Sequence, residues 1–437
     1  MDVSSKYFAL LRAPGPDVIK HVWRFLLDIR RVGKLRELAS FVLWEISHRL
    51  YIYQIGNRYI KFTDHACLSI TNECTAQTGD LITSAFLTEN GLCFRAVAID
   101  WKYCLQTTDG LWVGCRYSHP NALYGSDDQS QSAVLMYAFS HPITSLFITR
   151  QNVLFVCSNG LVYRSNNQGV SFNPVLKLSS VISYFLFNNG MTELPDGSLM
   201  IGEYGSIWRG KTWQNLAFLY HSTDGGDTWE SSDFLIRQGV NKHIHLVKYC
   251  LLLNSVLLTD GDNKKQLWMN AALADFHLQA DKPKNGWHLL TRYHHQTGGY
   301  TSMAETGKSV FFGSDYLGGT NFIVTTTDAR RFVKQVLPDP YRRSPVMNMV
   351  SRQAASGTEI WAASYSCLSD NARSLLMCTK DSEKTWTRVL DFDGTKNEVR
   401  LVNPSQDRSD ALFISVTEFK NGEDNHRHRV YKLERNC

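Results

Sequence analysis

The sequence contains no long hydrophobic run, and nothing in its 437 residues reaches the ~18 apolar residues that a membrane-spanning helix requires. The apolar stretch near the start, within MDVSSKYFALLRAPGPDVIK, is too short and too interrupted for a secretory signal. A basic run interleaved with aromatic residues is also missing, and the net charge is only +5. We therefore expect a cytoplasmic protein that does not bind nucleic acid.

Cysteine pairs are missing too. The ten cysteines are scattered, without a CxxC motif or a Cys/His cluster at zinc spacing. We predict reduced thiols, no bound metal and no cofactor. The phosphate-binding patterns GxGxxG and GxxxxGK[ST] are absent as well, which counts against a nucleotide-dependent enzyme.

The first fifty residues have a helical pattern that the rest of the chain lacks. Asp17 is a suitable N-cap, and a second helical stretch follows over 34–49. In the first stretch one helix face is apolar and consists of Val18, Val22, Phe25, Leu26 and Ile29. The basic residues of this stretch lie on the other faces: Lys20, Arg24, Arg30 and Arg31. We predict a helical extension over 1–50 that packs on the main domain as a cap. The alternative is a basic amphipathic anchor that contacts a membrane surface through residues 18–49.

From about residue 51 onward, short apolar runs are broken by Gly, Asn, Asp and Ser, which predicts many short strands. One octapeptide stands out, STDGGDTW at 222–229. Its Asp suits backbone N–H groups of a tight turn, its Gly tolerates positive φ, and its Trp packs beneath a hairpin. Degenerate copies start 57 residues before it, 104 residues after it and a further 53 residues on, at 165, 326 and 379. This period is typical of four-stranded propeller blades.

The octapeptide matches the S-x-D-x-G-x-T-W pattern of the Asp box, and over about three quarters of its length the chain resembles the Asp-box (BNR-repeat), sialidase-like β-propeller superfamily. The resemblance implies an all-β propeller over 51–437, with six or seven blades and seven favoured. It also implies that the boxes lie on hairpins between third and fourth strands, away from the active site.

Aligned on the boxes, the blades are predicted to begin their innermost strands near Met191, His243, Tyr300, Val346 and Glu398. In a propeller the starts of first strands and the ends of second strands share one face. Polar residues are therefore expected around one mouth. The candidate catalytic residues are Glu203, His243, His245, Tyr300, Asp260 and Asp315. The candidate substrate-binding residues are Tyr204, Lys242, Asp262, Tyr316, Arg342, Arg343 and Arg400.

These residue types suit a carbohydrate. Carboxylates gathered at a narrow mouth repel one another unless cations or ligand hydroxyls compensate. Two histidines on one side of a strand can share a substrate proton, and arginines can bind a carboxylate or sulfate through two hydrogen bonds. Tyrosines can stack on sugar rings. We predict a carbohydrate-active propeller whose ligand is an acidic glycan.

Several reactions remain open. β-Elimination needs a base, such as His243 or His245 with Tyr300, and a cation on the uronate. Hydrolysis needs two carboxylates, such as Glu203 with Asp260 or Asp315. Sialidase activity is not expected, because the R-I-P motif of sialidases is absent. The alternatives are a glycosyltransferase of glycan assembly at the inner face of a membrane, and a propeller that binds glycan or protein without catalysis.

Overall fold

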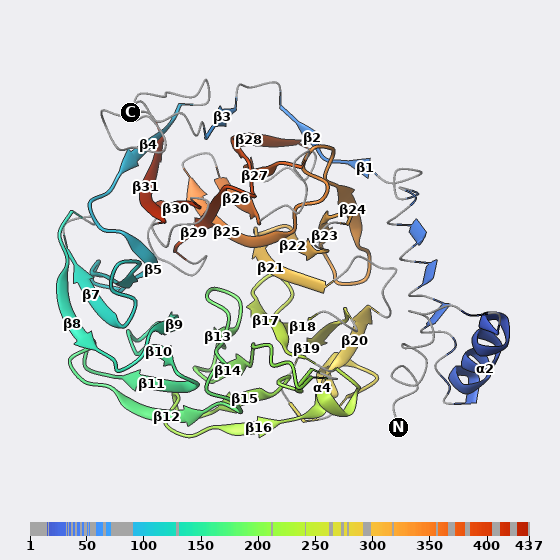
Figure 1. Ribbon diagram of the computed structural model, residues 1–437. Coiled ribbons are helices and arrows are strands. Elements are labelled where there is room, and N and C mark those ends of the chain that lie inside the picture. Colours follow the sequence, from blue (N-terminus) through green and yellow to red (C-terminus); the bar gives the residue numbers. More distant parts are fainter. Residues whose placement is uncertain are drawn as a thin grey trace.

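The protein is a seven-bladed β-propeller, as the computed structural model shows (Figure 1). The strands form seven separate sheets arranged in a ring, so the prediction of seven blades is confirmed. The structure describes residues 15, 17–31, 33, 35, 38–39, 42–43, 46–47, 50, 52, 58–63, 67–70, 91–127, 131–210, 213–240, 242–261, 265–271, 275–277, 279–291, 299–316, 319–354, 357–365, 372–380, 385–403, 411–419 and 426–435.

Blades 1 to 6 are each built from four consecutive antiparallel strands. Blades 1 to 3 consist of β5 (Trp101–Gln106), β6 (Trp112–Arg116), β7 (Ala122–Ser126) and β8 (Val134–Ala138); β9 (Ile143–Ile148), β10 (Leu154–Ser158), β11 (Leu161–Ser165) and β12 (Asn173–Lys177); and β13 (Met191–Glu193), β14 (Leu199–Gly202), β15 (Leu219–Ser222) and β16 (Glu230–Ser232). Blades 4 to 6 consist of β17 (Ile244–Cys250), β18 (Ser255–Asp260), β19 (Leu267–Asn270) and β20 (His288–Thr291); β21 (Gly299–Glu305), β22 (Val310–Asp315), β23 (Phe322–Thr326) and β24 (Val333–Val336); and β25 (Val346–Ala354), β26 (Gly357–Ser364), β27 (Ser374–Lys380) and β28 (Thr385–Phe392).

Blade 7 closes the ring. Its inner strands are β29 (Asn397–Leu401), β30 (Leu412–Glu418) and β31 (Arg427–Arg435), and its outer strand is β4 (Leu92–Ala96) from the other end of the propeller. The register runs from Tyr431 opposite Ala96 to Arg435 opposite Leu92. Pairing the last strand with the first leaves no open gap between the ends of the ring.

Cys93, in the closing strand β4, is disulfide-bonded, and its partner lies outside the described residues. The expectation of reduced thiols throughout is therefore wrong at this position. Six other described cysteines are free: Cys67, Cys104, Cys115, Cys157, Cys250 and Cys378.

Three short strands before β4 run along the outside of the ring. They are β1 (Arg58–Tyr59), β2 (Lys61–Phe62) and β3 (Leu68–Ser69). The first pairs with β24 of blade 5, and the other two pair with β28 of blade 6, all in parallel. The segment thus covers the outer edges of two blades just before the chain enters blade 7, and the sequence pattern did not predict it.

The hydrophobic core lies between blades rather than within one centre. Seven clusters of buried apolar side chains each join two neighbouring blades. Second strands such as β14 and β18 are buried along their whole length, because both faces of a blade pack against neighbours. Their continuous apolar pattern in the sequence reflects this two-sided burial.

The helices lie outside the blades. Those that fall wholly within the described residues are α2 (Val18–Arg31), α4 (Phe234–Arg237) and the short 3₁₀ helix η2 (Pro283–Asn285). None of the residues of α2 is fully buried, but Val18, Phe25, Leu26 and Ile29 of the predicted apolar face are half-buried. The packing of the extension as a cap stays a prediction. Most of the second predicted helical stretch, 34–49, lies outside the described residues. Among the described residues, no helix is both long and apolar enough to cross a membrane.

The octapeptide 222–229 forms the hairpin between β15 and β16, the third and fourth strands of blade 3. The Asp224 carboxylate accepts hydrogen bonds from the backbone N–H groups of Asp227 and Thr228, both at 3.0 Å. Ser222 Oγ accepts from Gly226 N at 2.8 Å. Gly226 has φ of 90° and approaches Phe155 so closely that a Cβ would lie 2.4 Å from that ring.

In two of the degenerate copies the Asp or Asn side chain also accepts a backbone hydrogen bond within the turn, and in the copy at 326 the donor lies closer along the chain, because this copy is one residue shorter. Between β11 and β12, Asn167 Oδ1 accepts from Ser171 N at 3.1 Å. Between β23 and β24, Asp328 Oδ1 accepts from Arg330 N at 2.9 Å. Residues 381–384 of the last copy lie outside the described part of the chain. The repeat therefore fixes the turn between third and fourth strands in blades 2, 3 and 5.

Asp224→Asn is expected to lower the melting temperature at pH 7 by about 1–3 °C. Hydrogen bonds from Thr228 and Ser222 hold the pKa of Asp224 well below its ordinary value. A depressed folded-state pKa stabilises the protein above the ordinary aspartate pKa of about 4, and this contribution disappears as the pH falls through the folded-state value. The melting temperatures of the two proteins should therefore converge between about pH 5 and pH 2.

Thermal unfolding followed by circular dichroism across this range measures the effect, with the exposed Asp281→Asn as the matched control. A difference between wild type and Asp224→Asn that stays constant down to pH 2 contradicts the assignment.

Candidate functional site

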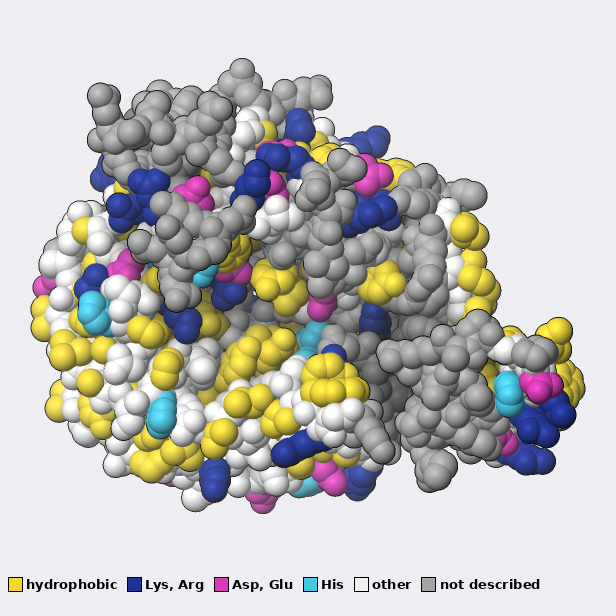
Figure 2. Space-filling view, in the orientation of Figure 1, with side chains coloured by type: hydrophobic (Ala, Val, Ile, Leu, Met, Phe, Trp, Pro, Cys, Tyr) yellow, Lys and Arg dark blue, Asp and Glu magenta, His cyan; other side chains and the backbone are white. Residues whose placement is uncertain are grey.

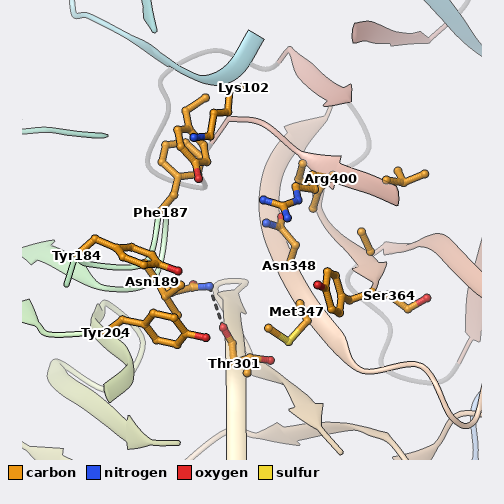
Figure 3. Close-up of a pocket in the computed structure, with 16 residues that line it drawn as sticks. Lys102, Tyr184, Phe187, Asn189, Tyr204, Thr301, Met347, Asn348, Ser364 and Arg400 are labelled. Atoms are coloured by element: carbon orange, nitrogen blue, oxygen red, sulfur yellow. Dashed lines mark hydrogen bonds between the residues drawn. The ribbon is translucent and has the colours of Figure 1, made fainter. Parts of the chain in front are cut away.

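An axial cavity of about 230 Å³ lies at the end of the ring where the first strands begin. Its walls come from β5, the segment before β13, β21, β25, β26 and β29, so five blades contribute to it. Figure 3 shows side chains from these elements facing one another across open space. The described lining holds five aromatic rings, two asparagines and two cations, and no acidic side chain.

Arg400, in β29, projects into this cavity (Figure 3). Although it lies inside the ring, 45% of its side chain is exposed. Its guanidinium pairs with Glu398, two residues earlier on the same strand, at 2.7 Å. Burial opposes the charge, but Glu398 and the nearby Tyr103 and Tyr365 raise the pKa of Arg400 above its ordinary value. The cavity therefore contains a permanent cation with exposed donors.

Tyrosines surround the cavity. The rings of Tyr184 and Tyr204 lie 5.1 Å apart, and Tyr103 packs on Phe187 at 4.5 Å. Burial raises the pKa of Tyr103 and of Tyr184 despite the opposing charge of Arg400. Both phenols are consequently neutral near pH 7, where they act as hydrogen-bond donors and as flat apolar faces.

Lys102, in β5, is the second cation of the lining. Its Nζ donates to the Ile143 carbonyl at 3.1 Å and lies 5.2 Å from the centre of the Tyr103 ring. Burial, and to a smaller extent the charge of Arg400, lowers the pKa of Lys102. The two cations disfavour each other, and an anion between them would relieve this repulsion.

Two asparagines of the lining have a side-chain oxygen that is buried and has no hydrogen-bond partner among the described residues. Asn189 is 3% exposed, and its Nδ2 donates to the Thr301 carbonyl at 2.9 Å while its Oδ1 accepts nothing. Asn348 Oδ1 is in the same condition. Buried polar atoms are rarely left unsatisfied, so these acceptors suit hydroxyl groups or water in the cavity.

A histidine pair lies behind Tyr204, whose ring packs on His243 at 4.1 Å. His243 Nε2 and His245 Nε2 are 3.0 Å apart, and His243 Nδ1 is 2.6 Å from the Gly205 carbonyl. Since a carbonyl only accepts, His243 carries a proton on Nδ1. In the neutral ring its Nε2 then accepts a hydrogen bond from the Nε2–H group of His245. A Cβ on Gly261 would lie 2.8 Å from His243 and 2.9 Å from His245, so a glycine is needed beside the pair.

The predicted carboxylates do not line the axial cavity. Glu203 is fully buried and accepts hydrogen bonds from Ser179 Oγ, Ser179 N and Tyr220 OH. Asp260 is also fully buried and accepts from the backbone N–H groups of Lys265 and Gln266. These two side chains hold chain segments together. Asp315 is half-buried at the end of β22, and Asp262 lies outside the described residues.

Of the other predicted residues, Tyr204 and Arg400 line the cavity. Tyr300 is buried in the core and stacks on Phe312. Arg342 is buried and bonds Thr320 Oγ1 at 2.8 Å. The remaining residues do not line the cavity either: Arg343 is half-buried, Lys242 lies 4.2 Å from the Trp213 ring, and Tyr316 packs under Lys265 at 4.7 Å.

Four residues of the lining were not predicted from the sequence: Lys102, Tyr184, Asn189 and Asn348. Blade 1 has no Asp box in its sequence. The start of β5, which contains Lys102, therefore could not be predicted by aligning the blades on their boxes. Tyr184 and Asn189 lie in the segment before β13, outside the strands that the boxes place. Asn348 could have been predicted, because it follows the predicted strand start at Val346 by two residues.

A second cavity, of about 400 Å³, lies at the opposite end of the ring, where first strands end. Its charged groups are engaged with each other and with the backbone. Arg150 pairs with Glu193 at 3.1 Å, and Glu305 accepts from Leu251 N and Leu252 N. The opposite cavity is lined by two carboxylates, Glu193 and Glu305. The axial cavity has two cations, two unsatisfied asparagine oxygens and no acidic side chain in its described lining, so it is the better candidate for a site that binds an anionic ligand.

Comparison with known proteins supports the fold alone. No family model and no curated protein matches the chain. Among solved structures, a streptogramin B lyase is similar with a TM-score of 0.50 and 13% identity, over 79% of this chain and 97% of that one. A catalytically inactive virginiamycin B lyase from Staphylococcus aureus with quinupristin gives 0.50 and 12%, over 78% and 98%. The extracellular domain of a hybrid two component system from B. thetaiotaomicron gives 0.52 and 10%, over 78% and 39%.

Nitrogen-15 NMR of histidine-labelled protein should show His243 as the Nδ1–H tautomer and His245 as the Nε2–H tautomer, because the Gly205 carbonyl fixes the first and the first fixes the second. His243→Gln and His245→Gln variants assign the two signals. The half-buried His288, in β20 at the outer edge of the same blade, provides the reference signal. The reverse pair of tautomers contradicts the hydrogen-bond scheme.

Proposed function

We propose that the axial cavity binds an acidic carbohydrate, with Arg400 on its carboxylate or sulfate group. The observation that carries this proposal is the partly exposed side chain of Arg400, which projects into a cavity whose described lining has no acidic side chain (Figure 3). Arginine presents donors in a planar fork that fits a carboxylate or a sulfate. Lys102 adds a second positive charge on the same lining.

The rest of the lining suits a sugar ring. The faces of Tyr184 and Tyr204 offer apolar surfaces for the C–H faces of a sugar, and their hydroxyls offer donors. Asn189 and Asn348 offer unsatisfied buried oxygens for sugar hydroxyls. An inorganic anion would use the arginine without needing either group. The Asp-box sequence and its hairpin geometry further support placing the chain in the sialidase-like propeller superfamily.

A glycosidase of the two-carboxylate type is less well supported. Such an enzyme needs two carboxyl groups facing the same glycosidic bond. The described lining offers none, and Glu203 and Asp260 are buried with donors of their own. Two other functions would use the same anion-binding subsite: a glycosyltransferase, and a propeller that binds glycan or protein without catalysis. Product assays distinguish both of them from a lyase.

β-Elimination is the second candidate, favoured because Tyr184 and Tyr204 face Arg400 across the cavity (Figure 3). In this reaction a base removes the proton beside the uronate carboxylate and the glycosidic C–O bond breaks. A C=C bond forms, and the leaving oxygen takes up a proton. Arg400 would stabilise the charge that develops on the carboxylate. Tyr184, whose pKa is raised by burial, suits the donor to the leaving oxygen. Tyr204, whose ring lies 5.1 Å from that of Tyr184, would have to be ionised to act as the base.

Arg400→Ala is expected to weaken binding of an acidic oligosaccharide by roughly 10- to 150-fold, since a hydrogen bond to a charged group contributes about 1.5–3 kcal/mol. Arg400→Lys should lose less affinity for the acidic oligosaccharide, because lysine keeps the positive charge but lacks the planar pair of donors of a guanidinium. Isothermal titration calorimetry against uronate, sialylated, sulfated and neutral oligosaccharides measures the effect. The matched control is Arg237→Ala, an arginine of similar exposure that also has an ion pair, with Asp233.

Equal affinity for acidic and neutral sugars, or an Arg400→Ala variant that binds the acidic sugar like wild type, contradicts the proposal. Thermal melts of each variant separate loss of the ligand site from loss of the fold.

If the protein is a lyase, uronate polymers should give the ultraviolet absorbance of unsaturated products, and Tyr184→Phe and Tyr204→Phe should each lower kcat by about 10²-fold or more. Tyr163→Phe, in β11 and outside the cavity, should have no effect. Reducing ends without ultraviolet absorbance would instead indicate hydrolysis. Binding without either product leaves a transferase or a binding protein, which a panel of activated sugar donors then separates.

A further inference from the structure

The helix α2 lies beside the propeller ring and away from the axial cavity (Figure 1). It is 14 residues long and has no buried residue. A helix of this length is about 21 Å long. An isolated helix this short is marginal in water and is usually stabilised by packing of its apolar face. Val18, Phe25, Leu26 and Ile29 of the apolar face are half-buried, so the exposed remainder of that face is the feature that needs a partner.

The exposed apolar residues of α2 form a continuous stripe along the helix. Ile19, Trp23 and Leu27 recur every four residues and so lie one above another on the helix, and their side chains are 84%, 64% and 37% exposed. Val22, beside them, is 40% exposed. Single exposed apolar residues are common, but a stripe of four on one short helix marks an interaction surface.

Basic side chains flank the stripe. Lys20, Arg24 and Arg31 lie together on one side of it, and Arg30 lies at its C-terminal end. Asp28 is the one acidic residue of the helix, and it lies 3.7 Å from Arg31. Four basic residues against one carboxylate leave a net charge of +3. At the right edge of Figure 2, hydrophobic and basic side chains of this helix lie next to each other.

We propose that α2 docks the protein on an anionic lipid surface, with the stripe in the interfacial region and the basic side chains on the headgroups. Charge complementarity favours this partner, because a short basic amphipathic helix with an exposed tryptophan has the composition of an interfacial helix. Lysine and arginine reach headgroups with long side chains while their methylenes stay beside the apolar stripe. The helix is too short to span a hydrocarbon core of about 30 Å, so it lies in the plane of the surface.

The test uses the full chain and vesicle flotation. Wild type should bind vesicles of phosphatidylcholine with about 30% phosphatidylserine at least tenfold more tightly than vesicles of phosphatidylcholine alone, and salt should weaken the binding. Trp23→Glu should lower the affinity at least tenfold by placing a charge in the stripe. The double variant Lys20→Glu with Arg24→Glu should abolish the preference for phosphatidylserine.

Trp208→Glu is the matched control, because this tryptophan is 55% exposed on the propeller and should leave vesicle binding unchanged. Melting temperatures equal to that of wild type show that the variants are folded. Failure of wild type to bind the anionic vesicles, or equal binding by wild type and Trp23→Glu, overturns the proposal. The proposal is also overturned if α2 binds a protein partner and the full chain binds no vesicles.

Discussion

Closure of the ring is the constraint on which the candidate site depends. Only when β4 pairs with β31 do blade 7 and blade 1 become neighbours, which brings Arg400 of β29 and Lys102 of β5 into one cavity. These two residues are almost three hundred positions apart in the sequence. The parallel strands β1 to β3 support the closure from outside, along the edges of blades 5 and 6.

The ring also separates structural charges from available ones. Glu203 and Asp260 are surrounded by hydrogen-bond donors and hold segments of blades 3 and 4 together. Arg400 lines the axial cavity, pairs with Glu398, and has 45% of its side chain exposed. Since buried carboxylates are stable only when donors surround them, a fully buried acid is a poor guide to a ligand site. A cation left exposed inside a protein is a better one.

The fold was predictable to the level of single strands because the Asp box fixes a local turn whose position in a blade is constant. The innermost strands predicted from Met191, His243, Tyr300, Val346 and Glu398 each begin within one residue of those positions. The site was predictable only in part. Strand spacing placed Tyr204 and Arg400 at the end of the ring where the axial cavity lies. It could not show that Tyr300 packs on Phe312 or that Glu203 is bonded to Tyr220. Burial and partners depend on packing between blades, which no local pattern encodes.

A crystal structure of the protein with an acidic oligosaccharide tests the central claim most directly. The account predicts carboxylate or sulfate oxygens about 2.7–2.9 Å from the Arg400 guanidinium, with the sugar ring against Tyr184 or Tyr204. It also predicts hydroxyls on the free oxygens of Asn189 and Asn348. A sugar bound in the opposite cavity beside Arg150, with the axial cavity holding none, would contradict it.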